Sequence, residues 1–266
     1  MNPDLFSTLR PFEGFGLLVV AWVFLSHFFG CFVRGAFGFG SNMPIVLMTT
    51  WVLGPHHAIL LAVLTTTAAQ LHLFRQGART ADWGVAKPLV IALAIGILIG
   101  LWVFVRLEAD WLTLVLGALM CGILLMDRMR LLSKLAERID IRALPVTSTL
   151  AVVSGAIGTI GGGGALYFLV IYLKLACTSA AALRGTGIVL TMVFVVVRLG
   201  GLLLAGLFTP TLLAEGLLLL PIALLGSWTG TRAFRAATTE QFFRWLQILM
   251  LCAAAALMVR GVIQVV

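Results

Sequence analysis

The sequence predicts an all-α integral membrane protein with two inverted-topology repeats of about five hydrophobic segments each. Three observations support this prediction. The 266 residues are 61% hydrophobic and only 11% charged, whereas a soluble domain carries about 25% charged residues on average. Apolar runs recur along the chain at lengths near the roughly 20 residues that cross a bilayer. Glycine-rich motifs recur in the same order in both halves.

Breaker residues divide the chain into apolar segments. The predicted segments are 17–38, 43–54, 57–75, 86–106, 110–127, 146–160, 164–176, 178–206, 210–232 and 242–263. Segments 43–54 and 164–176 are too short to cross a bilayer of about 30 Å unaided, and each follows a glycine-rich break. We expect them to be tilted crossings or re-entrant helices, which gives 8–10 transmembrane helices in total. A broken backbone survives in a membrane only where it is buried in protein or lines a cavity.

The loop charges predict the orientation of the chain. The net charge is +8, and most of the Lys and Arg residues lie in loops 76–85, 128–145 and 233–241 or at their borders, whereas loops 107–109 and 207–209 contain none. Because basic loops stay in the cytoplasm, we expect a multi-pass protein of the cell inner membrane with both termini outside. A basic chain can instead bind nucleic acid, but charges confined to the loops between apolar segments argue against that partner.

The two halves match in sequence order. Three pairs of motifs align, at shifts of 123 or 126 residues: Gly35-x-x-Gly38-x-Gly40 with Gly158-x-x-Gly161-x-Gly163, Arg75 with Arg198, and Gly100-x-Trp102-x-x-x-Arg106 with Gly226-x-Trp228-x-x-x-Arg232. We therefore predict a first transmembrane repeat at 1–127, a basic linker at 128–145 and a second repeat at 146–266. An odd number of crossings in each half would invert the second copy, as in many secondary transporters, which bind substrate where broken helices meet.

The glycine-rich breaks are the sharpest local feature. Four successive glycines end the motif 158–164, and each lowers helix propensity by about 1 kcal/mol relative to alanine. A helix that restarts after such a break presents free N–H groups and a positive dipole end, which favour an anion. In the first half, Ser41, Asn42 and Pro44 complete the break, and proline suits a first helical turn. The alternative is tight helix packing through small residues.

Ionisable residues inside the predicted spans point in the same direction. Arg34, Arg184 and Arg198 lie within apolar segments, whereas Glu215 is the one acid clearly inside a span. Charge at membrane depth is costly and usually functional, and buried arginines without buried acids favour an anionic substrate. The alternative is that each arginine snorkels to the interface or has a structural partner.

These arguments define the candidate site. The predicted substrate-binding residues are Arg34, Gly38, Gly40, Asn42, Gly161, Gly162, Gly163, Arg184 and Thr186. The predicted gating or supporting residues are Arg75, Arg198, Gln70 and His72. We expect no cofactor, metal or catalytic residue, because the four cysteines are scattered singly and no catalytic motif is present. The expected partners are a small anion and the lipid bilayer, and the chain is expected to be a monomer or a homodimer.

The motifs Gly35-Ala-Phe-Gly-Phe-Gly-Ser-Asn-Met-Pro44, Gly158-Thr-Ile-Gly-Gly-Gly-Gly164 and Arg184-Gly185-Thr186 resemble those of the sulfite exporter TauE/SafE family, over about residues 17–263. This resemblance implies transport of sulfite, sulfonates or related sulfur-containing anions. Tyr167 stands where the family often has a proline. The expected function is therefore a secondary transporter, most simply an exporter, that works by alternating access. The alternatives are a membrane-embedded enzyme or enzyme subunit acting on a lipid-linked substrate, and an anion channel.

Overall fold

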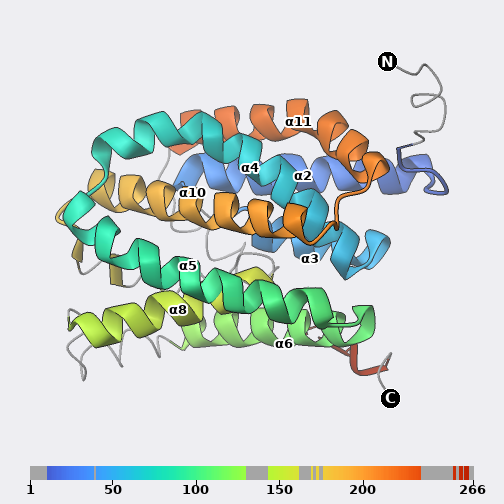
Figure 1. Cartoon of the computed structure of the whole chain (residues 1–266). Helices are drawn as coiled ribbons and strands as arrows, with labels where there is room; N and C mark the ends of the chain where they lie inside the picture. The colour runs from blue at the N-terminus through green and yellow to red at the C-terminus, as the bar shows by residue number, and fades with distance from the viewer. Residues whose placement is uncertain are drawn as a thin grey trace.

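A computed structural model describes residues 11–38, 40–129, 143–161, 169, 172–173, 176–234, 254–255, 258–259 and 261–263. Within these residues every regular element is a helix, which confirms the all-α prediction (Figure 1). The helices are α2 (Leu17–Phe37), α3 (Asn42–Leu53), α4 (Pro55–Thr80), α5 (Trp83–Arg106), α6 (Ala109–Arg128), α8 (Leu144–Ile160), α10 (Ala180–Leu204) and α11 (Pro210–Phe234).

Five of these helices, α2, α4, α5, α10 and α11, are long and apolar enough to cross a membrane. The chain is thus a multi-pass membrane protein, as its composition predicts. Most of the predicted boundaries hold within a few residues. The largest difference is loop 76–85, which shrinks to Ala81 and Asp82, because α4 continues to Thr80. The Asp82 side chain ends this loop by accepting the backbone N–H groups of Gly84 at 3.0 Å and Val85 at 3.3 Å, which caps α5.

The first glycine-rich motif breaks the helix, as predicted. Gly38 has a φ of 85° and Gly40 a φ of 89°, a left-handed conformation that glycine adopts without strain. After this break α3 runs back along α2. The hydrogen bond from the Trp22 indole to the Met48 carbonyl, 2.8 Å long, joins the second half of α3 to the first turns of α2. With 12 residues, α3 is only about 18 Å long at 1.5 Å per residue. It therefore returns toward the end at which α2 begins. The second short segment, 164–176, lies mostly outside the described residues.

Two helix pairs pack through glycine at backbone contact. An alanine Cβ at Gly35 would overlap the Ser227 carbonyl oxygen, and one at Gly230 would overlap that of Phe32, so α2 and α11 touch directly. In the same way, a Cβ at Gly96 would overlap the Val152 carbonyl oxygen where α5 meets α8. Such contacts are the small-residue packing that membrane helices use. Each pair joins one helix from the first half of the chain with one from the second half.

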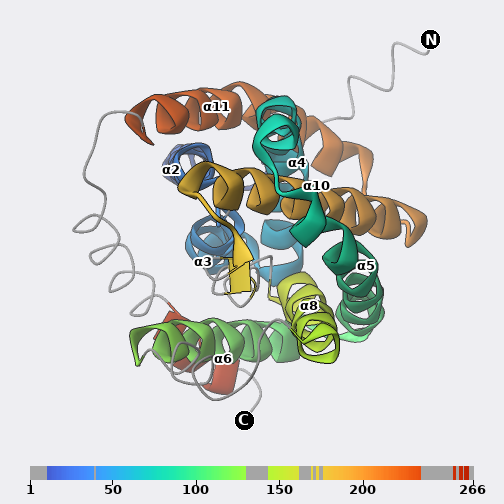
Figure 2. The same cartoon turned by 90° about the vertical axis from the view of Figure 1, so that its left-hand side faces the viewer.

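A third pair, α4 with α10, also joins the first half of the chain to the second. The Gln70 amide donates to the Ile188 carbonyl at 2.6 Å, and the Thr186 hydroxyl accepts the Asp82 backbone N–H at 2.9 Å, so the two helices run antiparallel. In Figure 2, α10 passes through the middle of the molecule, with α2 and α11 on one side and α6 and α8 on the other.

The matched tryptophan and arginine motifs of the two halves form the same local structure. The Arg106 guanidinium lies 4.3 Å from the ring centroid of Trp102, and the Arg232 guanidinium lies 3.6 Å from that of Trp228. Each arginine follows its tryptophan by one helical turn, where a cation–π contact forms. The glycine that begins each motif touches a neighbouring helix backbone, Gly100 at Ala156 and Gly226 at Phe28.

Candidate functional site

Arg34 organises the break between α2 and α3. Its side chain is 2% exposed, and each of its three nitrogens donates a hydrogen bond. Nε donates to Ser41 Oγ at 2.6 Å, and Nη2 donates to Asn42 Oδ1 at 2.9 Å. Nη1 donates to Gln70 Oε1 at 2.6 Å and to the Thr66 carbonyl oxygen at 3.4 Å. The last two acceptors lie near the middle of α4, so this guanidinium is at membrane depth.

The partners of Arg34 are all neutral. Two hydroxyl or amide side chains of the break and one amide of α4 hold the guanidinium in place. The structure therefore unites four predicted residues, Arg34, Gly38, Asn42 and Gln70. Because no acid among the described residues pairs with Arg34, its positive charge is not cancelled at the break. An uncancelled cation at membrane depth attracts an anion.

Arg184 reaches the same break from α10. Its Nη2 donates to the Gly35 carbonyl oxygen at 2.9 Å, and the Thr231 hydroxyl donates to the same oxygen at 3.2 Å. The Arg184 side chain also packs against Gly38, where an added Cβ would lie 3.2 Å from its Cγ. Arg184 thus adds a second cation beside the left-handed turn, from the other half of the sequence. Thr186 does not join it, because its hydroxyl binds the Asp82 backbone.

Arg198 lies beside the C-terminal end of α8. It is 1% exposed, and its Nη2 donates to the Thr159 carbonyl oxygen at 2.7 Å. Thr159 is in the last turn of α8, which ends at Ile160, directly before Gly161. The guanidinium carbon lies 6.0 Å from the centroid of the Phe104 ring and 5.7 Å from that of Phe194. Within the described part of the chain, Nε and Nη1 have no hydrogen-bond acceptor.

Not all predicted site residues come together. Arg184 and Arg198 are fourteen positions apart on α10, about 21 Å along the helix axis, and each reaches a different break. Arg75 and His72 lie on the exposed side of α4, apart from buried Gln70. Gly162 and Gly163 lie outside the described residues. Positions 72 and 75 could not be separated from position 70 by sequence alone, since all three lie in one apolar run.

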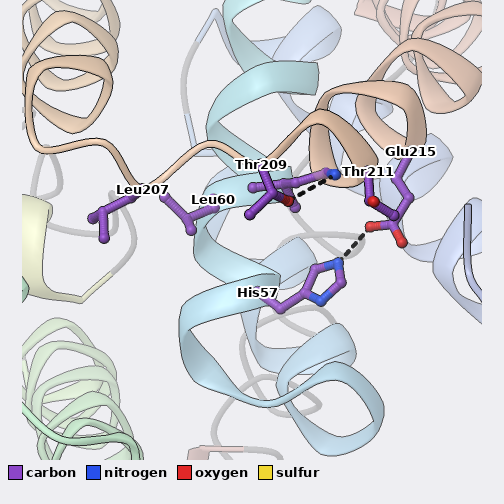
Figure 3. Close-up of a pocket in the computed structure, with 7 residues that line it drawn as sticks. His57, Leu60, Leu207, Thr209, Thr211 and Glu215 are labelled. Atoms are coloured by element: carbon purple, nitrogen blue, oxygen red, sulfur yellow. Dashed lines mark hydrogen bonds and ion pairs between the residues drawn. The ribbon is translucent and has the colours of Figure 1, made fainter. Parts of the chain in front are cut away.

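A cavity of about 240 Å³ lies elsewhere, at the end of the molecule where α4 and α11 begin (Figure 3). It is lined by His57, Leu60, Leu207, Thr209, Thr211, Leu212 and Glu215. His57 Nε2 lies 2.5 Å from Glu215 Oε2, and Glu215 Oε1 accepts the Phe12 backbone N–H at 3.0 Å. The buried charged group of this cavity is a carboxylate that pairs with a histidine, and none of the described arginines lines it. The sequence signal for it was the lone acid inside a span, but the partner His57 is 158 positions away.

We expect Glu215→Ala to lower the free energy of unfolding by about 1–3 kcal/mol, because it leaves the Phe12 N–H and the His57 ring without their acceptor. The apparent unfolding temperature of the detergent-purified protein measures this loss. Glu108→Ala, at an exposed acid of the α5–α6 connection, is the matched control and should change little. Equal unfolding temperatures for Glu215→Ala and the wild type would show that the pair does not hold α4 and α11 together.

Several membrane-crossing helices around a broken helix with buried arginines define a multi-pass membrane protein that holds positive charge among its helices. The chain belongs to the sulfite exporter TauE/SafE family, whose model matches residues 23–258. No curated protein and no solved structure matches the chain. Membership of this family implies a membrane transporter of anions, which agrees with the cationic lining of the first break.

Proposed function

We propose that the protein is a secondary transporter that exports a small sulfur-containing anion, such as sulfite or a sulfonate. The observation that carries this proposal is the sign of the buried charge. Among the described residues, the ionisable side chains beside the helix breaks are the buried Arg34 and Arg198 and the partly buried Arg184. The one buried acid in this part of the chain is Glu215, which pairs with His57 in a different place. A cation site would need carboxylates at the breaks.

The contacts between the halves support an inverted repeat. Under the shifts found in the sequence, α2 corresponds to α8, α4 to α10, and α5 to α11. If each helix is replaced by its counterpart, the observed pair α2–α11 becomes the observed pair α8–α5. The pair α4–α10 becomes itself. Residue numbers of the contacting positions increase together along α2 and α11, and also along α5 and α8, so the helices of each of these pairs are parallel. In contrast, α4 and α10 run antiparallel. A two-fold axis in the membrane plane produces this pattern.

The same correspondence supports a mechanism of alternating access. The α2–α3 hairpin, which enters and returns from one side, is a re-entrant element in this proposal, and the break after α8 is its counterpart from the other side. Rocking of one half against the other would expose the breaks to each side in turn. In this proposal the basic loops lie on the cytoplasmic side of the inner membrane. Because the inside of the cell is negative, an anion then leaves down the membrane potential without a coupled ion.

Flux in proteoliposomes tests this function. We expect saturable uptake of labelled sulfite, which unlabelled sulfite accelerates from the opposite side, because a carrier exchanges substrate but a channel does not. Sodium, potassium and small amines should neither compete nor be transported. A flux that never saturates would indicate a channel instead, and the absence of any flux with sulfite, thiosulfate, sulfoacetate and taurine would overturn the substrate class.

Arg184→Gln should lower this flux at least about tenfold, since one lost charge–anion contact at low dielectric weakens binding by more than about 1.4 kcal/mol. Arg106→Gln is the matched control, because Arg106 is an exposed arginine at a helix end. Flux of Arg184→Gln equal to that of Arg106→Gln would remove Arg184 from the transport site. Size-exclusion profiles of both variants exclude misfolding as the cause.

A further inference from the structure

Arg198 differs from the other buried arginine in what its nitrogens bind. The three nitrogens of Arg34 all have acceptors, whereas only Nη2 of Arg198 donates to a described residue. Among the described residues, its Nε and Nη1 have no acceptor and no acid pairs with this guanidinium. A buried donor without a partner costs about 1–3 kcal/mol, and more when the group is charged. Two such groups on one cation favour an additional acceptor.

The environment of Arg198 fixes the guanidinium without using its donors. The rings of Phe104 and Phe194 approach it within 6.0 and 5.7 Å, and both side chains are buried. Aromatic faces stabilise a cation but accept no strong hydrogen bond. The Thr159 carbonyl anchors one nitrogen. The described residues therefore hold the remaining N–H groups in position and leave them available.

Thr191 adds a hydroxyl on the same side of α10. It lies seven residues before Arg198, which is nearly two full turns, so both side chains share one face of the helix. Long helical side chains lean toward the N-terminus, and this brings the guanidinium toward Thr191. Thr191 is 2% exposed, and its hydroxyl too has no partner among the described residues. A hydroxyl and a guanidinium together are suitable donors for an oxyanion.

Phe104 contacts both Arg198 and a residue at the start of α4. It lies two residues before the end of α5 and is fully buried. The His56 ring packs on it from the start of α4, with ring centroids 5.3 Å apart. Arg198 and His56 thus contact the same aromatic ring. Buried rings beside the guanidinium exclude water from it, which strengthens its attraction for an anion.

We propose that Arg198 is a direct anion-binding residue, and that its Nε and Nη1 groups, with the Thr191 hydroxyl, hold an oxyanion beside the end of α8. This inference rests on the proposed function and places a binding position at the second break. It is distinct from the first break, where Arg34 is occupied by protein acceptors. The ligand class is a small oxyanion with several acceptor oxygens, such as the sulfite group or the head of a sulfonate.

Equilibrium binding of sulfite to the full-length protein in detergent tests this inference without requiring transport. We expect Arg198→Gln to weaken sulfite binding at least tenfold, because it removes the charge and most donors. Arg198→Lys keeps the charge but has one nitrogen, and should weaken binding less. Thr191→Val should weaken it a few-fold. Arg232→Gln, at an arginine that stacks on Trp228 instead, should bind sulfite as the wild type does.

The outcomes separate the two proposals. Binding by the wild type together with unchanged affinity in Arg198→Gln would overturn the role of Arg198 and leave the proposed function standing. If Arg198→Gln does not fold, unchanged affinity in both Arg198→Lys and Thr191→Val would overturn that role equally. If the wild type binds neither sulfite nor taurine nor sulfoacetate, both proposals fail. Fluorescence of the tryptophans checks that each variant remains folded.

Discussion

Replacing Gly35 with alanine is expected to lower the free energy of unfolding by about 3 kcal/mol, which makes it one of the most damaging single-methyl changes in the chain. The added Cβ would overlap the backbone carbonyl of Ser227, which cannot rotate away as a side chain would. The same displacement would pull the Gly35 carbonyl from Arg184. The apparent unfolding temperature in detergent measures the effect.

The matched control for this change is Gly200→Ala on α10. Gly200 is also helical, but no described atom lies within 4 Å of an added Cβ. Alanine should therefore stabilise α10 by up to about 1 kcal/mol through helix propensity. Gly96→Ala at the α5–α8 contact should behave as Gly35→Ala does. If Gly35→Ala and Gly200→Ala were equally stable, the direct backbone contact between α2 and α11 would be wrong.

Arg34→Gln is expected to reduce transport of sulfite more than tenfold and to lower the free energy of unfolding by about 2–4 kcal/mol. The substitution removes the donors that Ser41, Asn42 and Gln70 share. Ser41 and Asn42 belong to the break, whereas Gln70 lies in the middle of α4. Without the guanidinium, the hydrogen bonds that connect the break to α4 through Arg34 are lost. Flux and unfolding temperature together measure the change.

Arg34→Lys separates the two roles of this residue. Lysine keeps the positive charge but cannot bind three acceptors in a fixed fork. If the charge at the break attracts the anion, Arg34→Lys should retain more flux than Arg34→Gln at a similar loss of stability. Equal flux in both variants would assign Arg34 to holding the α2–α3 break alone. Flux of Arg34→Gln at the wild-type level would remove Arg34 from the transport mechanism altogether.

Local features of the fold were predictable because they depend on neighbours in sequence. The apolar runs predict the helix positions within a few residues, since length and hydropathy decide which segments are buried in lipid. Gly38 and Gly40 predict the break, since they adopt the left-handed backbone that other residues avoid. The error at loop 76–85 has a local cause too. Polar residues such as Gln76 and Arg79 end an apolar run, but α4 continues through them to Thr80.

Residue roles within the site were less predictable, because they depend on contacts between distant segments. Thr186 follows Arg184 closely in sequence, yet its hydroxyl binds the Asp82 backbone instead of the break. His72 lies only two residues from Gln70, but two residues on a helix are about 200° apart, so one is exposed and the other buried. Helical phase alone does not say which face meets α10.

The class of protein, the position of the first break and the sign of the buried charge could all be read from the sequence, because they follow from composition and from residues adjacent along the chain. Only the folded chain shows that Arg198 has N–H groups to which no described residue offers an acceptor. Arg34 and Arg198 have the same chemistry, but the residues that surround Arg34 supply acceptors whereas aromatic rings flank Arg198. Hydrogen-bond satisfaction is a property of the packed environment, and packing is set by helices far apart in the sequence.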